Sequence, residues 1–159
     1  MTNVGRSLAV AAVVFAGQSF TGAPISAQEV LSAEGETPDV RIEVRDLKRG
    51  DGGTMTLRLR LVNESGEAFE GSCLMREPGQ NDNCGTFSGA YILDATNKKK
   101  YLVVRDADGQ CVCSGVDNID DGKKMNIWAT YPAPPPDVQK VTVIVPLFEP
   151  IEGVPIAGP

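Results

Sequence analysis

Residues 55–61 read MTLRLRL, and this run decides how the rest of the chain is interpreted. Its apolar side chains occupy every second position from Met55 to Leu61, with polar or charged side chains between them. Successive side chains of a β-strand point to opposite faces, so this period of two predicts a strand with one buried and one solvated face. Residues 63–66 (NESG) supply turn-forming side chains that end it.

The same alternation occurs just before this run. Residues 39–45 alternate Val40, Ile42 and Val44 with charged side chains. Residues 48–53 (KRGDGG) lie between the two runs and have the composition of a turn. We therefore expect residues 39–45 and 55–61 to form an antiparallel pair.

Further short strands are expected later in the chain. They cover residues 88–94, 101–105, 124–131 and 138–145, with turns at residues 97–99 and 106–109. The proline-punctuated tail after residue 145 can only lie at a sheet edge or run as irregular chain, because proline donates no backbone hydrogen bond. About seven short strands and no helical period predict an all-β protein, an antiparallel sandwich of two sheets.

The N-terminus has the features of a secretory signal peptide. Arg6 precedes an apolar stretch at residues 8–17 (LAVAAVVFAG), and Ala27 is a small residue at the expected cleavage point. The stretch is too short to span a bilayer, which takes about 20 residues, so we expect no membrane span after cleavage; an uncleaved anchor is the alternative. The predicted organisation is a signal peptide at 1–27, a flexible lead-in at 28–38 and the sandwich at 39–157.

Composition narrows the possible functions. The 159 residues include 15 Lys and Arg against 21 Asp and Glu, a net charge of −6, and no histidine. The missing histidine removes the commonest general base and the imidazole ligand of most zinc sites, so we predict that the protein is not an enzyme. The acidic balance argues against nucleic acid or anionic lipid as a partner, because both require clustered Lys and Arg.

Four cysteines, at positions 73, 84, 111 and 113, are the sharpest chemical feature. In an exported chain they should form disulfides. The favoured pairing is Cys73 with Cys84 and Cys111 with Cys113; crossed pairings remain open. The first bridge would close a loop of about 12 residues and stabilise the fold by roughly 3 kcal/mol. The close spacing of the second pair leaves two alternatives, thiol exchange and copper binding by thiolates with methionine.

Two loops carry carboxylates at short spacing, residues 106–109 (DADG) and 117–122 (DNIDDG). They raise the alternative of a calcium carrier, but neither matches the twelve-residue calcium loop, and turn chemistry explains both. Two carboxylates could also hydrolyse glycosides without histidine, although aromatic residues make up only 6% of the chain and offer little for a sugar platform. We therefore predict no cofactor and no metal.

Two further positions carry specific expectations. Trp128 is expected to be buried, as large aromatic side chains usually are. Residues 63–65 (NES) fit a glycosylation sequon but are interpreted as a turn.

Three stretches also resemble a known family. They are residues 88–94 (SGAYILD), 99–114 (KKYLVVRDADGQCVCS) and 128–143 (WATYPAPPPDVQKVTV). Together they are similar to a family of exported bacterial domains with an immunoglobulin-like sandwich, which occur alone or ahead of an OmpA-like peptidoglycan-binding domain and are largely without assigned function. The resemblance covers about residues 39–156 and implies a fold and a compartment, with no catalytic residues. This sequence ends at Pro159 without an OmpA-like domain, so a link to peptidoglycan is not carried over.

The expected function is that of a non-catalytic envelope or extracellular module that mediates protein interaction or adhesion with an unidentified protein partner. A sandwich uses its sheets for the core and presents binding groups on end loops or an open edge. The candidate interaction residues are accordingly Asp106, Asp108, Asp120, Asp121, Pro134 and Pro135, with the loop between Cys73 and Cys84 beside them. A small-ligand or metal carrier and a thiol-exchange protein are the alternatives.

Overall fold

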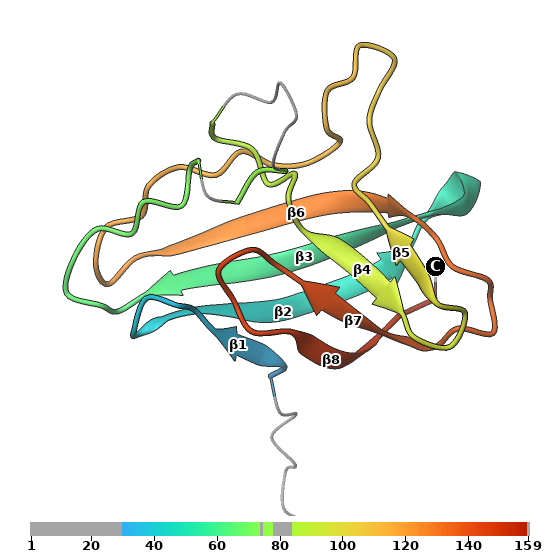
Figure 1. The fold of residues 1–159 in the computed structure, drawn as a ribbon, viewed down its shortest axis with the longest axis horizontal. Coiled ribbons are helices and arrows are strands. Elements are labelled where there is room, and N and C mark those ends of the chain that lie inside the picture. The colour runs from blue at the N-terminus through green and yellow to red at the C-terminus, as the bar shows by residue number, and fades with distance from the viewer. Residues whose placement is uncertain (1–29, 74, 78–83, 159) are drawn as a thin grey trace, which may run out of the picture.

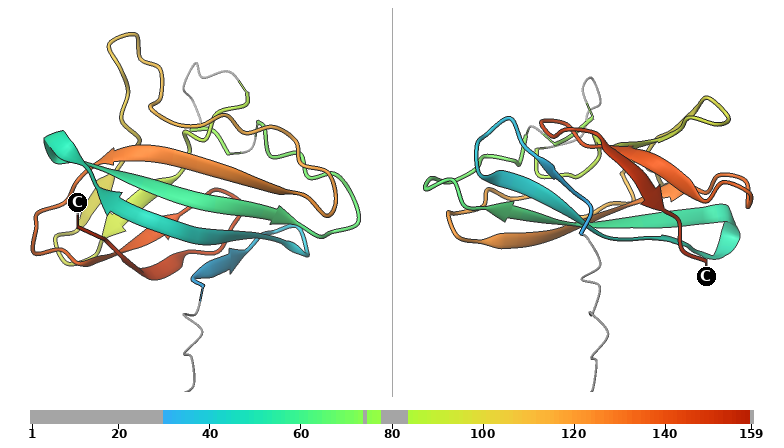
Figure 2. Two further views of the ribbon diagram at one scale, coloured as in Figure 1. Left: turned by 180° about the vertical axis from the view of Figure 1, so that it is seen from behind. Right: turned by 90° about the horizontal axis from the view of Figure 1, so that it is seen from below.

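Two antiparallel four-stranded sheets form the fold in the computed structural model, which describes residues 30–73, 75–77 and 84–158 (Figure 1). The first sheet has the order β1 (Ser32–Glu34), β2 (Val40–Arg49), β3 (Thr54–Asn63) and β6 (Lys124–Pro132). The second has the order β5 (Lys99–Tyr101), β4 (Tyr91–Asp94), β7 (Lys140–Ile144) and β8 (Ile151–Pro155). The two sheets lie face to face, so the fold is an all-β sandwich (Figure 2).

The antiparallel pair expected from the alternating runs is confirmed as β2 and β3. Ile42 lies opposite Leu61, and Leu47 lies opposite Leu57. A bulge between Val44 and Asp46 shifts the phase of β2 by one residue, so that Leu47 rather than Asp46 faces the core. Because the bulge interrupts the alternation, the sequence pattern stops at residue 45 although the strand continues to Arg49.

The later strands are found close to their expected places. Residues 88–94 and 138–145 contain β4 and β7, and residues 124–131 cover β6 except for its last residue, Pro132. The proline-punctuated tail forms β8 at the edge of the second sheet. The strand expected at 101–105 is placed differently, because β5 ends at Tyr101. Beyond it the chain leaves the second sheet, and the Val104 N–H donates to the carbonyl of Thr130 on β6 at 2.8 Å.

The expectation that residues 28–38 form an unpacked lead-in was wrong. Residues 32–34 form β1, which pairs with β2 and buries Ala33 to 6% exposure. A strand of three residues with one small buried side chain has no readable period, so composition alone did not reveal it. Residues 28 and 29 and the predicted signal peptide at 1–27 lie outside the described residues.

The core lies between the sheets and is extended by the loops that cover one end. The inner faces of the strands supply most of it: Val40, Ile42, Leu47, Met55, Leu57, Leu59, Leu61, Ile92, Ile127, Tyr131, Val141, Val143, Ile151 and Val154. The segments between β3 and β4 and between β5 and β6 add Phe69, Phe87, Val116 and Ile119. Within the described residues, the short 3-10 helix η1 (Asp51–Gly53) is the only helical element, and no helix could cross a membrane.

Candidate functional site

Trp128 stands on the outer face of the first sheet. Its exposed fraction is 39%, so the expectation that it is buried was wrong. Alternation along β6 turns Ile127 and Ala129 into the core, which leaves Trp128 on the solvent side, directly opposite Arg58 on β3. A large apolar side chain is therefore held in solvent on a regular strand.

Six side chains on this side line an open hollow, which we call the arginine–tryptophan face. They are Arg45 and Asp46 of β2, Arg58 and Arg60 of β3, and Asn126 and Trp128 of β6. The bulge of β2 brings Arg45 and Asp46, which are adjacent in sequence, to the same hollow. The register between β3 and β6 places the other four side chains together: Arg60 lies opposite Asn126, and Arg58 lies opposite Trp128.

The charges of this face are only partly compensated. The Nη1 atom of Arg58 lies 2.9 Å from Oδ1 of Asp46. Arg45 and Arg60 make no hydrogen bond or ion pair with any described residue. Three guanidinium groups thus share one carboxylate within the hollow.

Two further carboxylates, Glu43 and Glu64, lie near the face and interact with Arg41 of β2. Arg41 donates to Glu64 at 2.6 Å and approaches Glu43 at 3.5 Å. The hydrogen bond from Arg41 holds the pKa of the Glu64 carboxyl below its usual value, and the same bond raises the pKa of Arg41. The positive charge of the face is therefore compensated in part, by Asp46 at Arg58 and by Glu43, which lies opposite Arg60 in the strand register.

The edge of the first sheet beside Trp128 is already paired. The Ser114 N–H donates to the carbonyl of Trp128 at 2.8 Å, and the Trp128 N–H donates to Oγ of Ser114 at 3.0 Å. Farther along, the Thr130 N–H donates to the carbonyl of Val112 at 3.0 Å. These bonds fix the backbone under the indole ring, and they leave no room for an incoming strand at this part of the edge.

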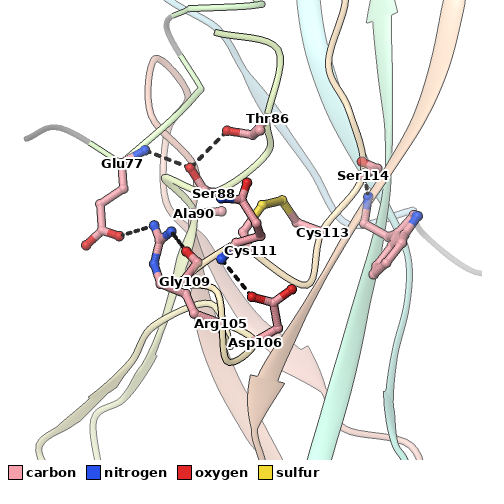
Figure 3. The surroundings of a disulfide bond; sticks show 12 residues. Glu77, Thr86, Ser88, Ala90, Arg105, Asp106, Gly109, Cys111, Cys113 and Ser114 are labelled. Carbon is pink, nitrogen blue, oxygen red and sulfur yellow. Dashed lines mark hydrogen bonds and ion pairs between the residues drawn. A yellow bond between two sulfur atoms is a disulfide. The ribbon is translucent and has the colours of Figure 1, made fainter. Parts of the chain in front are cut away.

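The favoured disulfide pairing is confirmed. Cys73 is joined to Cys84, and Cys111 is joined to Cys113 with 5.3 Å between the Cα atoms. Among the described residues no cysteine is free, so no thiolate is present for a soft metal. The Cys111–Cys113 bridge lies on the returning arm of a hairpin that projects from the sandwich (Figures 1 and 3).

One of the two carboxylates that the sequence marked for binding in this hairpin, that of Asp106, is used in hydrogen bonds within it. The Asp106 carboxylate accepts the N–H groups of Asp108 and Gln110 at 3.0 and 2.9 Å, which is ordinary turn chemistry. Arg105 donates to the carbonyl of Gly109 and to Glu77, each drawn in Figure 3. Asp108 itself is exposed.

The remaining predicted loop residues are not brought to one place. Asp120 and Asp121 are exposed in the loop before β6, where the Asp121 carboxylate accepts the Gly66 N–H at 3.0 Å. In the segment after β6, Pro135 is exposed but Pro134 is buried. The expectation that Pro134 is a contact residue is therefore corrected: it is buried, and its carbonyl accepts a hydrogen bond from Arg49 of β2 at 2.6 Å.

Within the part of the chain that the structure describes, no three His, Cys, Asp or Glu side chains converge on one point. Comparisons with protein families, curated proteins and solved structures find no match for this chain. The arginine–tryptophan face was missed because sheet faces were treated as core surface. The signal was present, since Arg58, Arg60, Asn126 and Trp128 all occupy the polar positions of the alternating runs.

Proposed function

We propose that this protein is a non-catalytic, exported binding module of the immunoglobulin-like class that holds a macromolecular partner on its arginine–tryptophan face. One observation carries the proposal: Trp128 is exposed on a regular strand and shares a hollow with three arginines, two of which make no ion pair with a described residue. Tryptophan and arginine are the side chains most enriched where interfaces gain their binding energy. Their grouping on one rigid sheet face is what favours a binding role.

Two features support a binding role outside the cytoplasm. The two disulfides suit an oxidising compartment, where such bonds persist. The face stands on three paired strands, so its side chains keep their spacing without a partner, which lowers the entropic cost of binding. It replaces the loop residues as the proposed contact surface.

The test is site-specific crosslinking in the cells that make the protein. A photoreactive amino acid at Asn126, on the face, should give a product of higher mass. The same amino acid at Lys140, exposed on β7 of the opposite sheet, should give none. Trp128→Ala should abolish the Asn126 product, whereas Leu102→Ala, which truncates another exposed apolar side chain elsewhere, should not. Equal products at Asn126 and Lys140, or none at either, would overturn the proposal.

A further inference from the structure

We infer that the partner held on the arginine–tryptophan face is an acidic polysaccharide, a chain of sugar rings that carry carboxylate groups. This inference rests on the proposed function and adds the chemical class of the ligand. It is argued from the charge of the face, from the kind of apolar surface it offers, and from the closure of the sheet edge beside it.

The charge favours an anionic ligand. Arg45 and Arg60 make no hydrogen bond or ion pair with a described residue, and the three arginines of the face outnumber the carboxylates beside them, Asp46 in the hollow and Glu43 opposite Arg60. A guanidinium group presents a planar fork of donors that matches a carboxylate. The net charge of −6 does not prevent this, because at physiological ionic strength charges farther away than about 8 Å are largely screened.

The apolar surface favours a sugar over a protein. Protein interfaces have an apolar core built from several side chains. The arginine–tryptophan face offers one, the indole of Trp128, and its other side chains are three arginines, an aspartate and an asparagine. The C–H face of a sugar ring can lie flat on an indole, while its hydroxyl groups can bond to Asn126 and to the arginines. One aromatic platform among polar groups suits a sugar ring.

The sheet edge argues in the same direction. Peptides are often bound as an added strand, through backbone hydrogen bonds to an open edge. Beside Trp128 these backbone groups are used by Ser114, and those of Thr130 are used by Val112 and Val104. The ligand must therefore lie across the outer side chains, where it is recognised without peptide-type pairing.

The ligand class can be tested with the purified, disulfide-bonded protein and three polymers. The probes are polygalacturonate, neutral dextran and poly-glutamate, measured by calorimetric titration. We expect binding to polygalacturonate that weakens as salt is added, and no binding to dextran. Poly-glutamate, which has carboxylates but no sugar rings, should bind at least about tenfold more weakly.

Variants separate the contribution of the indole ring from that of the arginine charges. Trp128→Ala and the double variant Arg45→Ala/Arg60→Ala should each weaken polygalacturonate binding about tenfold or more. Trp128→Phe should retain part of it, because a ring remains. Leu102→Ala and Lys140→Ala, matched changes on other surfaces, should stay within about twofold, and thermal melting checks that every variant is folded.

Each outcome decides between the claims. Equal or tighter binding of poly-glutamate would replace the sugar with an acidic polypeptide and overturn this inference. Binding that survives Trp128→Ala would overturn it as well, since it would mark a charge effect alone. If no polymer binds while crosslinking at Asn126 still yields a product, the ligand class is wrong and the proposed function stands. If both fail, the face is not a binding site.

Discussion

At the residue scale, Asn63 organises the end of the sandwich where β3 leaves the sheet. Its side chain is fully buried, and its Nδ2 donates to the carbonyls of Glu67 and Ile119 at 2.7 and 2.8 Å. Its Oδ1 accepts the N–H and the hydroxyl of Ser65. The amide thus connects two loops that are distant in sequence. It also agrees with the interpretation of residues 63–65 as a turn, because a buried, fully bonded amide is not accessible for glycosylation.

Replacing this amide should be costly. Asn63→Ala removes four hydrogen bonds, of which the one to the Ile119 carbonyl is buried, so we expect a loss of about 1–3 kcal/mol in the free energy of unfolding. Urea denaturation measures it. Asn126→Ala, on the exposed face and without a hydrogen bond among the described residues, is the matched control and should stay within about 0.5 kcal/mol. Similar losses in both variants would contradict the role of Asn63.

Asp94 gives the fold a dependence on pH. Its buried carboxylate accepts the side-chain N–H of Asn97 at 2.7 Å and the backbone N–H of Asn97 at 3.1 Å. These bonds, the side-chain one foremost, hold its pKa below the ordinary value of 3.8. A depressed pKa contributes stability that is complete above the unfolded value and is lost as the pH falls through the folded value.

Melting temperatures measured against pH test this contribution. We expect the wild-type curve to fall more steeply than that of Asp94→Asn below about pH 4, because only the wild type must protonate this carboxylate. Asn97→Ala removes the largest cause of the shift and should also flatten the curve. Parallel curves for the wild type and Asp94→Asn would show that Asp94 makes no such contribution.

At the scale of elements, the two disulfides stabilise very different lengths of chain. Cys73 and Cys84 are 11 positions apart, whereas Cys111 and Cys113 are two apart. The chain-entropy account assigns about 3 kcal/mol to the longer closure and about 1.5 kcal/mol to the shorter. The shorter bridge instead lies where Cys113 pairs with Ala129, in the segment that covers the edge of β6.

Two double variants measure this difference. Cys73→Ala/Cys84→Ala should lower the free energy of unfolding by about 3 kcal/mol, and Cys111→Ala/Cys113→Ala by about half as much. Hydrogen exchange at the Ser114 and Thr130 amides should rise more in the second variant, because its bridge lies beside those bonds. If the second variant is the less stable, loop length does not govern the contribution of these bridges.

At the scale of the whole molecule, the two sheets are joined at both ends by backbone pairing and by one arginine. Lys48 of β2 pairs with Ala157 beyond β8, and Gly35 beyond β1 pairs with Phe148. Arg49 adds a clamp at the end where β6 leads into β7. Its guanidinium donates to three carbonyls of the proline-rich segment, those of Pro134 at 2.6 Å and of Pro135 and Val138 at 3.0 Å.

Removing this clamp should loosen the connection between the sheets. We expect Arg49→Ala to lower the free energy of unfolding by about 2 kcal/mol, since charged donors make the stronger hydrogen bonds. Arg49→Lys should recover little of it, because an ammonium group cannot reach three carbonyls as a planar fork does. Lys48→Ala, an adjacent exposed cation, is the control and should change stability by no more than about 0.5 kcal/mol. A full recovery by lysine would contradict the clamp.

Much of the fold follows from local pattern, and the exceptions have identifiable causes. The alternation in residues 55–61 and 124–131 predicts β3 and β6 because each run has one apolar side. The pattern ends early in β2, where a bulge shifts the phase, and it gives no sign of β1. The bulge depends on the pairing of β2 with β3, and β1 depends on its pairing with β2. No local stretch of sequence contains these contacts.

In the candidate site, too, some features follow from local sequence pattern and others only from tertiary structure. The sequence by itself determined a two-sheet, strand-based fold and the absence of a histidine for catalysis, because period and composition are local properties; it favoured one cysteine pairing, and the structure decided it. Only the tertiary structure decided that Trp128 is exposed, that Pro134 is buried, and that Arg45, Arg58 and Arg60 meet beside the indole. The reason is physical: alternation says that two faces differ, but the packing of the second sheet and the register between strands decide which face meets solvent and which side chains become neighbours.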